Sequence, residues 1–127
     1  MTDNLTYLDF ATDEVLYLTD SYNKGLRYNA MVSQAQRVCE CYIKHIISKS
    51  LLNNTDVMMS HNLRKLYDFL CSMGLDVRDI RSDVMLLNNF YTHTRYPGKE
   101  AFMASSEDVD SAVSAISRIS AALAKYF

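Results

Sequence analysis

Apolar residues recur at steps of three and four along nearly the whole chain, which is the spacing of one face of an α-helix. The pattern falls into five segments with short connections. The 127 residues include only three glycines and one proline, so the chain lacks the turn residues that many short strands would need. We therefore predict a single all-α domain over residues 1–127, an up-and-down bundle of four to five helices.

Start and stop signals give approximate bounds for the first two helices. The first is expected to begin near Asn4 or Thr6 and to end at Gly25, and the second to run from about Arg27 to Leu51. Residues on the inward face of the second helix are predicted to be Tyr28, Met31, Val32, Ala35, Val38, Tyr42, Ile46 and Ile47. Its polar residues, Lys44 and the glutamines among them, are expected on the solvated side.

The other three helices have similar signals. Turn chemistry is expected between Leu52 and Met59. Ser60 is predicted to cap the third helix and Asp76 the fourth. The third helix is expected to end at Gly74, and the fourth at about Arg95 or Tyr96, before Pro97. The fifth is expected to start at Ser105, with Asp108 completing a near capping box.

Polar groups gather where the fourth helix is predicted to end, between residues 88 and 98. Asn88, Tyr91 and Arg95 are spaced to share one helix surface. An arginine there could cap its own helix, pair with an acid on a neighbouring helix, or bind a carboxylate or phosphate. Downstream, Phe102 and Met103 could plug the end of the core or contact a partner.

Composition excludes several function classes. The formal net charge is −2 with no basic run, which argues against nucleic-acid or anionic-membrane binding through bulk charge. The three cysteines have no zinc spacing, and Cys41 with His45 is a single i, i+4 pair. We expect no signal segment and no membrane span, and the sequence shows no nucleophile elbow or glycine-rich phosphate loop. We expect a cytoplasmic protein with reduced thiols, no metal, no cofactor and no catalytic residue.

Three segments together resemble the HEPN domains, the nucleotide-binding domains of higher eukaryotes and prokaryotes. Residues 35–44, Ala-Gln-Arg-Val-Cys-Glu-Cys-Tyr-Ile-Lys, are similar to the long helix of that family. His-Asn-Leu at 61–63 resembles the family's His-Asp-Leu, and Tyr-Thr-His-Thr-Arg-Tyr-Pro at 91–97 resembles its Tyr…Arg-Tyr-Pro end. The resemblance implies a helical bundle, commonly a homodimer, that acts with a minimal nucleotidyltransferase. It implies a ligand pocket made of Glu40, Lys44, His61, Tyr91, Arg95 and Tyr96.

The leading hypothesis is a nucleotide or other anionic ligand held in this pocket, with Lys44 and Arg95 on phosphate oxygens. A non-catalytic interaction module is the alternative, and a ribonuclease toxin is a third possibility. HEPN ribonucleases carry an arginine followed after four to six residues by a histidine, and no arginine has that spacing here. Asn62 replaces the family's usual aspartate, which removes an acid that could orient His61.

Overall fold

The computed structural model describes residues 4–50, 55–94 and 96–127. Over these residues the chain is helical and contains no strand, which confirms the predicted all-α bundle. The α-helices are α1 (Tyr7–Asn23), α2 (Asn29–Ser48), α3 (Thr55–Met58), α4 (Leu63–Ser72), α5 (Arg81–His93) and α6 (Ser106–Leu123). Two short 3₁₀ segments, η1 (Arg78–Ile80) and η2 (Ala124–Tyr126), precede α5 and follow α6.

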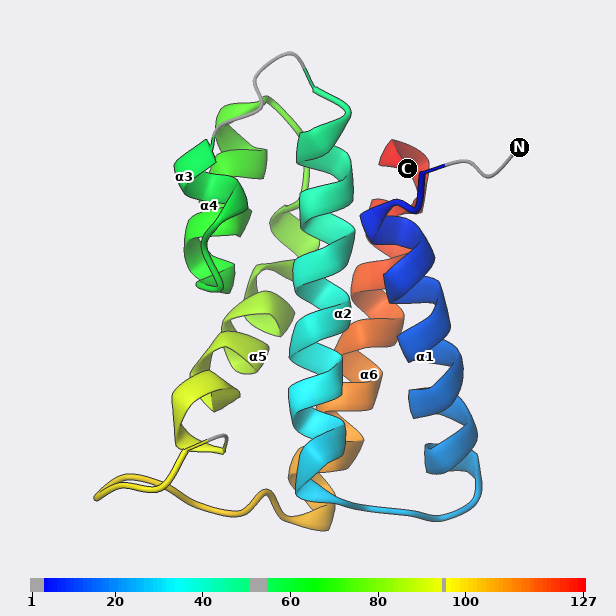
Figure 1. Cartoon of the computed structure of the whole chain (residues 1–127), viewed down its shortest axis with the longest axis vertical. Coiled ribbons are helices and arrows are strands. Elements are labelled where there is room, and N and C mark those ends of the chain that lie inside the picture. The colour runs from blue at the N-terminus through cyan, green and yellow to red at the C-terminus, as the bar shows by residue number, and fades with distance from the viewer. Residues whose placement is uncertain (1–3, 51–54, 95) are drawn as a thin grey trace.

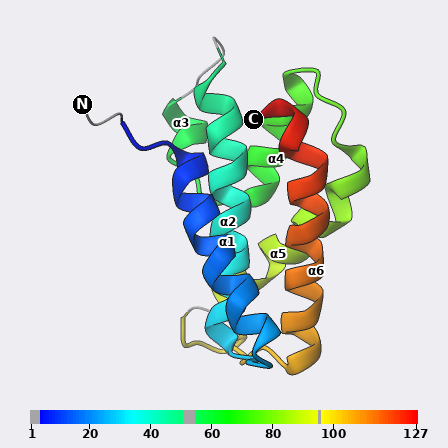
Figure 2. The same cartoon turned by 90° about the vertical axis from the view of Figure 1, so that its right-hand side faces the viewer.

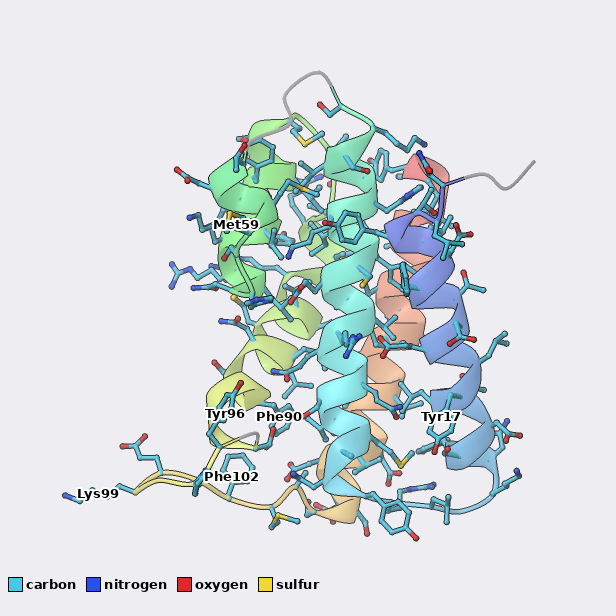
Figure 3. The ribbon with its side chains drawn as sticks, in the orientation of Figure 1. Tyr17, Met59, Phe90, Tyr96, Lys99 and Phe102 are labelled. Carbon is cyan, nitrogen blue, oxygen red and sulfur yellow. The ribbon has the colours of Figure 1, made fainter. Side chains whose placement is uncertain are left out.

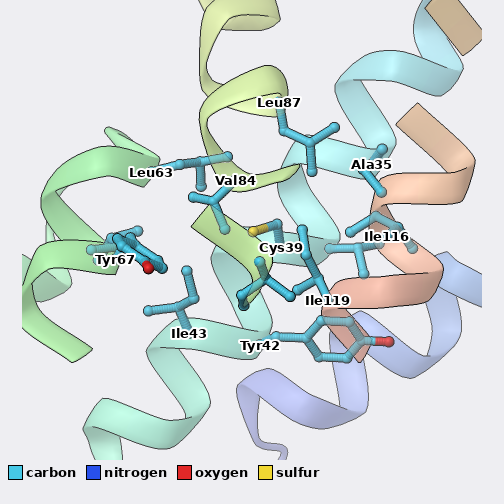
Figure 4. Packing of buried hydrophobic residues seen from close by; sticks show 14 of the residues in the cluster. Ala35, Cys39, Tyr42, Ile43, Leu63, Tyr67, Val84, Leu87, Ile116 and Ile119 are labelled. Atoms are coloured by element: carbon cyan, nitrogen blue, oxygen red, sulfur yellow. The ribbon is translucent and has the colours of Figure 1, made fainter. Parts of the chain in front are cut away.

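Helix α2 is the centre of the bundle. Figure 1 shows it between α1 and α6 on one side and α4 and α5 on the other, and Figure 2 shows α1 and α6 in front of it. One apolar core joins these helices, and Figure 4 shows residues of α2, α4, α5 and α6 meeting inside it. Fully buried members from α2 include Ala35, Cys39 and Ile43. Residues on several faces of α2 are therefore buried, whereas a helix at the edge of a bundle buries only one face.

The predicted helix ends are largely confirmed by their caps. Thr6 and Asp9 form a reciprocal capping box at the start of α1, and Ser105 and Asp108 form another at the start of α6. Gly25 and Gly74, which follow α1 and α4, both have a φ of 86°. That left-handed conformation is accessible to glycine without the Cβ clash that other residues suffer, so these turns end the helices where the sequence indicated.

Two predicted caps are wrong. The side chain of Asn62, and not that of Ser60, accepts from the first amides of α4, while Ser60 Oγ accepts from the Asn62 amide. Asp76 does not cap a helix either. Its carboxylate binds the Arg78 guanidinium, and the chain makes the 3₁₀ turn η1 before α5 begins. The turn predicted between residues 52 and 59 includes the short helix α3, and residues 51–54 lie outside the described part.

The predicted polar face of α2 is also wrong in part. Lys44 is buried, with 4% of its surface exposed, and Gln36 is buried with 2% exposed. The Gln36 side-chain amide donates to the Leu87 carbonyl on α5, so a polar residue takes part in helix packing. Tyr28, predicted to face inward, precedes α2 and is exposed. Among the described helices, none has both the length and the apolar character needed to cross a bilayer.

Candidate functional site

Three of the predicted site residues meet on one side of α2. Lys44 Nζ lies 3.0 Å from Glu40 Oε2, one helical turn away. His61 Nδ1 lies 3.1 Å from Glu40 Oε1 and 3.2 Å from Oε2. The lysine is buried, Glu40 is partly buried and His61 is largely exposed. We call these three residues the Glu40 cluster.

Local structure fixes the position of each member. Glu40 and Lys44 are four residues apart on α2 and therefore share a face. His61 stands immediately before Asn62, the cap of α4. The start of α4 is tied to α5 because the Leu63 amide donates to Asn88 Oδ1 at 2.9 Å. Asn88, noted from the sequence as part of the polar end of the fourth helix, thus positions the segment that carries His61.

The Glu40 cluster borders a surface hollow of about 380 Å³. The hollow is lined by Tyr7 and Phe10 from α1, by Arg37, Glu40 and Cys41 from α2, and by His61. A second hollow of about 420 Å³ shares the rings of Tyr7 and Phe10. Both rings are exposed, with 37% and 53% of their residue surface open to solvent. The site therefore combines exposed aromatic rings with an arginine, a histidine and the Glu40 carboxylate, which pairs with Lys44.

The sequence reasoning missed Tyr7 and Phe10. A signal was present, because the apolar stripe of the first helix runs through Leu8, Ala11 and Val15. Two aromatic residues that lie off this stripe are expected on the exposed side of the helix, where large rings are less common than polar groups.

The charges near the hollow are largely balanced. Arg37 Nε lies 3.2 Å from Glu14 Oε1, and the other oxygen of Glu14 is buried without a hydrogen-bond partner. Burial raises the pKa of Glu14, and the nearby Arg37 opposes that rise. Burial, reinforced by the charge of Glu40, raises the pKa of Cys41 to about 11. The Cys41 thiol is therefore protonated at neutral pH and is a poor nucleophile.

Tyr96 does not join the Glu40 cluster. It is exposed at one end of the bundle, where it lines a separate hollow of about 530 Å³ with Pro97, Phe102 and others. Figure 3 shows Tyr96 beside Phe90 and Phe102 at that end. Asn29, the first residue of α2, contacts the same loop, and Glu40 follows it by eleven residues. A helix of that length rises about 16 Å, so one small ligand is too short to contact both groups.

The loop that carries Tyr96 is held by Asn29. Its amide nitrogen donates to the Thr94 carbonyl at 2.8 Å, and its oxygen accepts from the Ala104 amide at 2.7 Å. Phe102 partly plugs the end of the core, since its ring lies 6.1 Å from that of Phe90, whereas Met103 is 77% exposed. The ring contact fits the expectation that this loop covers the end of the core, whereas contact of Met103 with a partner stays a prediction.

Two further predicted residues cannot be placed in either group. The backbone of Tyr91 belongs to α5, but its side chain lies outside the described part of the chain, and so does the whole of Arg95. The predicted role of Arg95 on a ligand phosphate stays a prediction.

The described histidines and cysteines lie in separate environments. Among the described residues, no group of three or more His, Cys, Asp or Glu side chains is arranged to hold a metal ion. His45 is buried with its ring 5.9 Å from that of Phe127, and its Nδ1 has no hydrogen-bond partner. Cys39 is fully buried and Cys71 is exposed, so the three cysteines lie in different environments and are free.

Comparison with known families agrees with the all-helical fold. The family model described as the HEPN domain matches residues 7–126, nearly the whole chain. The protein belongs to the HEPN domain family. Searches of curated proteins and of solved structures give no match. The α-helices of the described residues and the order of the three family-like segments are therefore both expected of a single HEPN domain.

Proposed function

We propose that this HEPN domain binds a nucleotide in the hollow beside the Glu40 cluster. The observation that carries the proposal is a buried lysine that fixes a carboxylate at the edge of a hollow lined with aromatic rings and an arginine. Burying an ammonium group is costly unless it is paired, so Lys44 holds Glu40 in place. Such a fixed polar group in a partly apolar hollow is typical of ligand sites.

The lining suits the separate parts of a nucleotide. Tyr7 and Phe10 offer exposed rings for a base, and stacking on an aromatic side chain contributes about 1–3 kcal/mol per base. Arg37 Nε lies 3.2 Å from Glu14 Oε1, and its Nη atoms make no hydrogen bond to any described residue. They can therefore donate to phosphate oxygens. His61 lines the same hollow, and Glu40 can accept a hydrogen bond from a ribose hydroxyl.

This assignment changes the role expected of Lys44. Its Nζ is buried against Glu40 and it does not line the hollow, so we assign it to positioning Glu40 instead of contacting phosphate. Because Glu40 and Glu14 offset the charges of Lys44 and Arg37, a bare anion finds no strong positive field there. A nucleotide, which also has a base to stack, fits the hollow better than inorganic phosphate.

The proposal includes the partners implied by the family resemblance. We propose that the domain acts with a minimal nucleotidyltransferase and forms a homodimer, without itself carrying out catalysis. An interaction module is the second candidate function, and the exposed Met103 and Tyr96 at the end of the bundle favour it. The two functions use different surfaces and can coexist in one protein.

Thermal shift and calorimetry with ATP, GTP and inorganic pyrophosphate test the nucleotide proposal, because a ligand of the folded state raises its apparent stability. We expect a nucleotide to bind and Arg37→Ala to weaken its binding by about tenfold, since a charge-assisted hydrogen bond is lost. Arg78→Ala is the control, because Arg78 is exposed and pairs with Asp76 far along the chain. Tyr7→Ala should weaken nucleotide binding without changing the response to pyrophosphate.

Either of two results would contradict the proposal. If no nucleotide gives a shift or detectable heat, the interaction module becomes the better assignment. If Arg37→Ala and Arg78→Ala weaken binding equally, the loss reflects overall charge and not this hollow.

A further inference from the structure

A second groove lies between α1 and α6, away from the Glu40 cluster. Its volume is about 580 Å³, within the range of small-molecule sites. The apolar side chains of Val15 and Leu18 line it from α1, and the hydroxyl groups of Ser114 and Ser117 line it from α6. Tyr42 from α2 also lines it. The groove thus presents a mainly apolar surface with a row of hydroxyl groups along one wall.

Tyr42 is the polar group that distinguishes this groove from ordinary surface. The residue is 4% exposed, and its ring packs 5.1 Å from that of Phe127. Its hydroxyl makes no hydrogen bond to any residue that the structure describes. Figure 4 shows this hydroxyl pointing away from Ile43 and Tyr67, towards the side where α1 and α6 lie. Since Tyr42 lines the groove and its hydroxyl has no partner among the described residues, this hydroxyl is available to donate a hydrogen bond to a ligand there.

Charge is confined to one end of the groove. Asp110 Oδ1 accepts from Arg27 Nε at 2.8 Å and from the Tyr22 hydroxyl at 2.9 Å. The guanidinium of Arg27 also lies 3.8 Å from the centre of the Tyr22 ring. These contacts join α1 to α6 where Figure 2 shows the two helices converging. The residues that line the groove carry no formal charge, so an ion would lose hydration there without gaining a partner.

We propose that the groove between α1 and α6 binds a neutral, flat and partly apolar small molecule that carries a hydrogen-bond acceptor. The acceptor, such as a carbonyl oxygen, takes the hydrogen bond of the Tyr42 hydroxyl. The ring of the ligand contacts Val15 and Val113, which are partly exposed, and its edge faces the serines of α6. This site is independent of the proposed nucleotide site, because the two use different faces of α1.

The test uses amide NMR shifts of the whole chain titrated with benzamide, benzoate and benzylammonium, which share a ring and differ in charge. We expect benzamide to give saturable shifts at residues 15–23 and 113–121, and both ions to bind at least about tenfold more weakly. Tyr42→Phe keeps the ring and should weaken benzamide binding by about fivefold. Ser117→Leu should fill the groove and abolish binding, whereas Ser111→Leu, an exposed change on α6 outside the groove, should not.

Several results would overturn the proposal. The absence of saturable shifts, equal binding of benzoate, or benzamide binding that survives Ser117→Leu would each remove the ligand from this groove. Light scattering adds a separate outcome. A dimer that Ser117→Leu dissociates and Ser111→Leu leaves intact would assign the groove to a second copy of the chain.

Discussion

Removal of the Glu40 carboxylate is expected to destabilise the fold through Lys44. The exposed fractions of the two side chains are 17% for Glu40 and 5% for Lys44. Breaking a fully buried ion pair by deleting one partner costs about 3–5 kcal/mol, because the remaining charge is stranded. Since water reaches part of Glu40, we expect Glu40→Ala to lower the free energy of unfolding by about 2–3 kcal/mol.

The opposite deletion should cost less. Lys44→Met removes the buried charge and leaves a side chain of similar length, while Glu40 keeps His61 and some contact with water. We expect a loss of about 1 kcal/mol from Lys44→Met, as for a moderate change at a buried site. The double variant should be close to Lys44→Met alone, because no charge remains stranded. The resulting coupling energy, which is the cost of the double change minus the costs of the two single changes, is about 2–3 kcal/mol in magnitude.

Urea unfolding followed by circular dichroism measures these differences. With a slope of about 1–3 kcal/mol/M, Glu40→Ala should lower the urea midpoint by roughly 1 M or more while the slope stays constant. Arg64→Ala, which removes an exposed partner of Asp68, is the matched control and should change stability by less than about 1 kcal/mol. If Glu40→Ala costs no more than this control and the cycle is additive, the reasoning about a stranded lysine is refuted.

Two further predictions concern the ends of elements. Asn29→Ala removes both hydrogen bonds to Thr94 and Ala104, so it should cost about 1–3 kcal/mol in urea unfolding and speed amide exchange between those residues. The amide and hydroxyl of Thr6 donate to Asp9 and hold its pKa below the usual 3.8. The free energy of unfolding of wild type should therefore exceed that of Asp9→Asn at pH values above 3.8. This difference should disappear as the pH falls through the lowered folded-state pKa. Equal exchange rates in the loop, or a difference for Asp9→Asn that does not change with pH, would contradict these predictions.

The fold could be predicted from the sequence because its signals are local. The capping box of Thr6 and Asp9 needs only four consecutive residues, and the glycine at 25 stops α1 by its own backbone freedom. Apolar spacing then indicates which face of each helix enters the core. Ala35 and Val38, for example, were expected on the inward face of the second helix and are both fully buried.

The environment of α2 could not be predicted in the same way. A central helix packs on several sides, so Lys44 and Gln36 become buried although they lie off the apolar stripe. Their partners differ in sequence distance: Glu40 is one turn away, whereas the Leu87 carbonyl belongs to α5. At the start of α4, Asn62 accepts from the Arg64 and Lys65 amides, and the Leu63 amide donates to Asn88 on α5, a contact that local sequence does not indicate.

The arrangement around Glu40 also indicates how a ligand would enter the site. One oxygen of Glu40 is held by Lys44, which is too deeply buried to exchange its partner for water at low cost. His61 Nδ1 lies 3.1 Å from one oxygen of the same carboxylate and 3.2 Å from the other, and the His61 side chain is 60% exposed. A ligand group that needs Glu40 as an acceptor therefore competes with His61 and not with Lys44. In the proposed nucleotide complex the lysine keeps the carboxylate in place, and the histidine is the member of the cluster that moves.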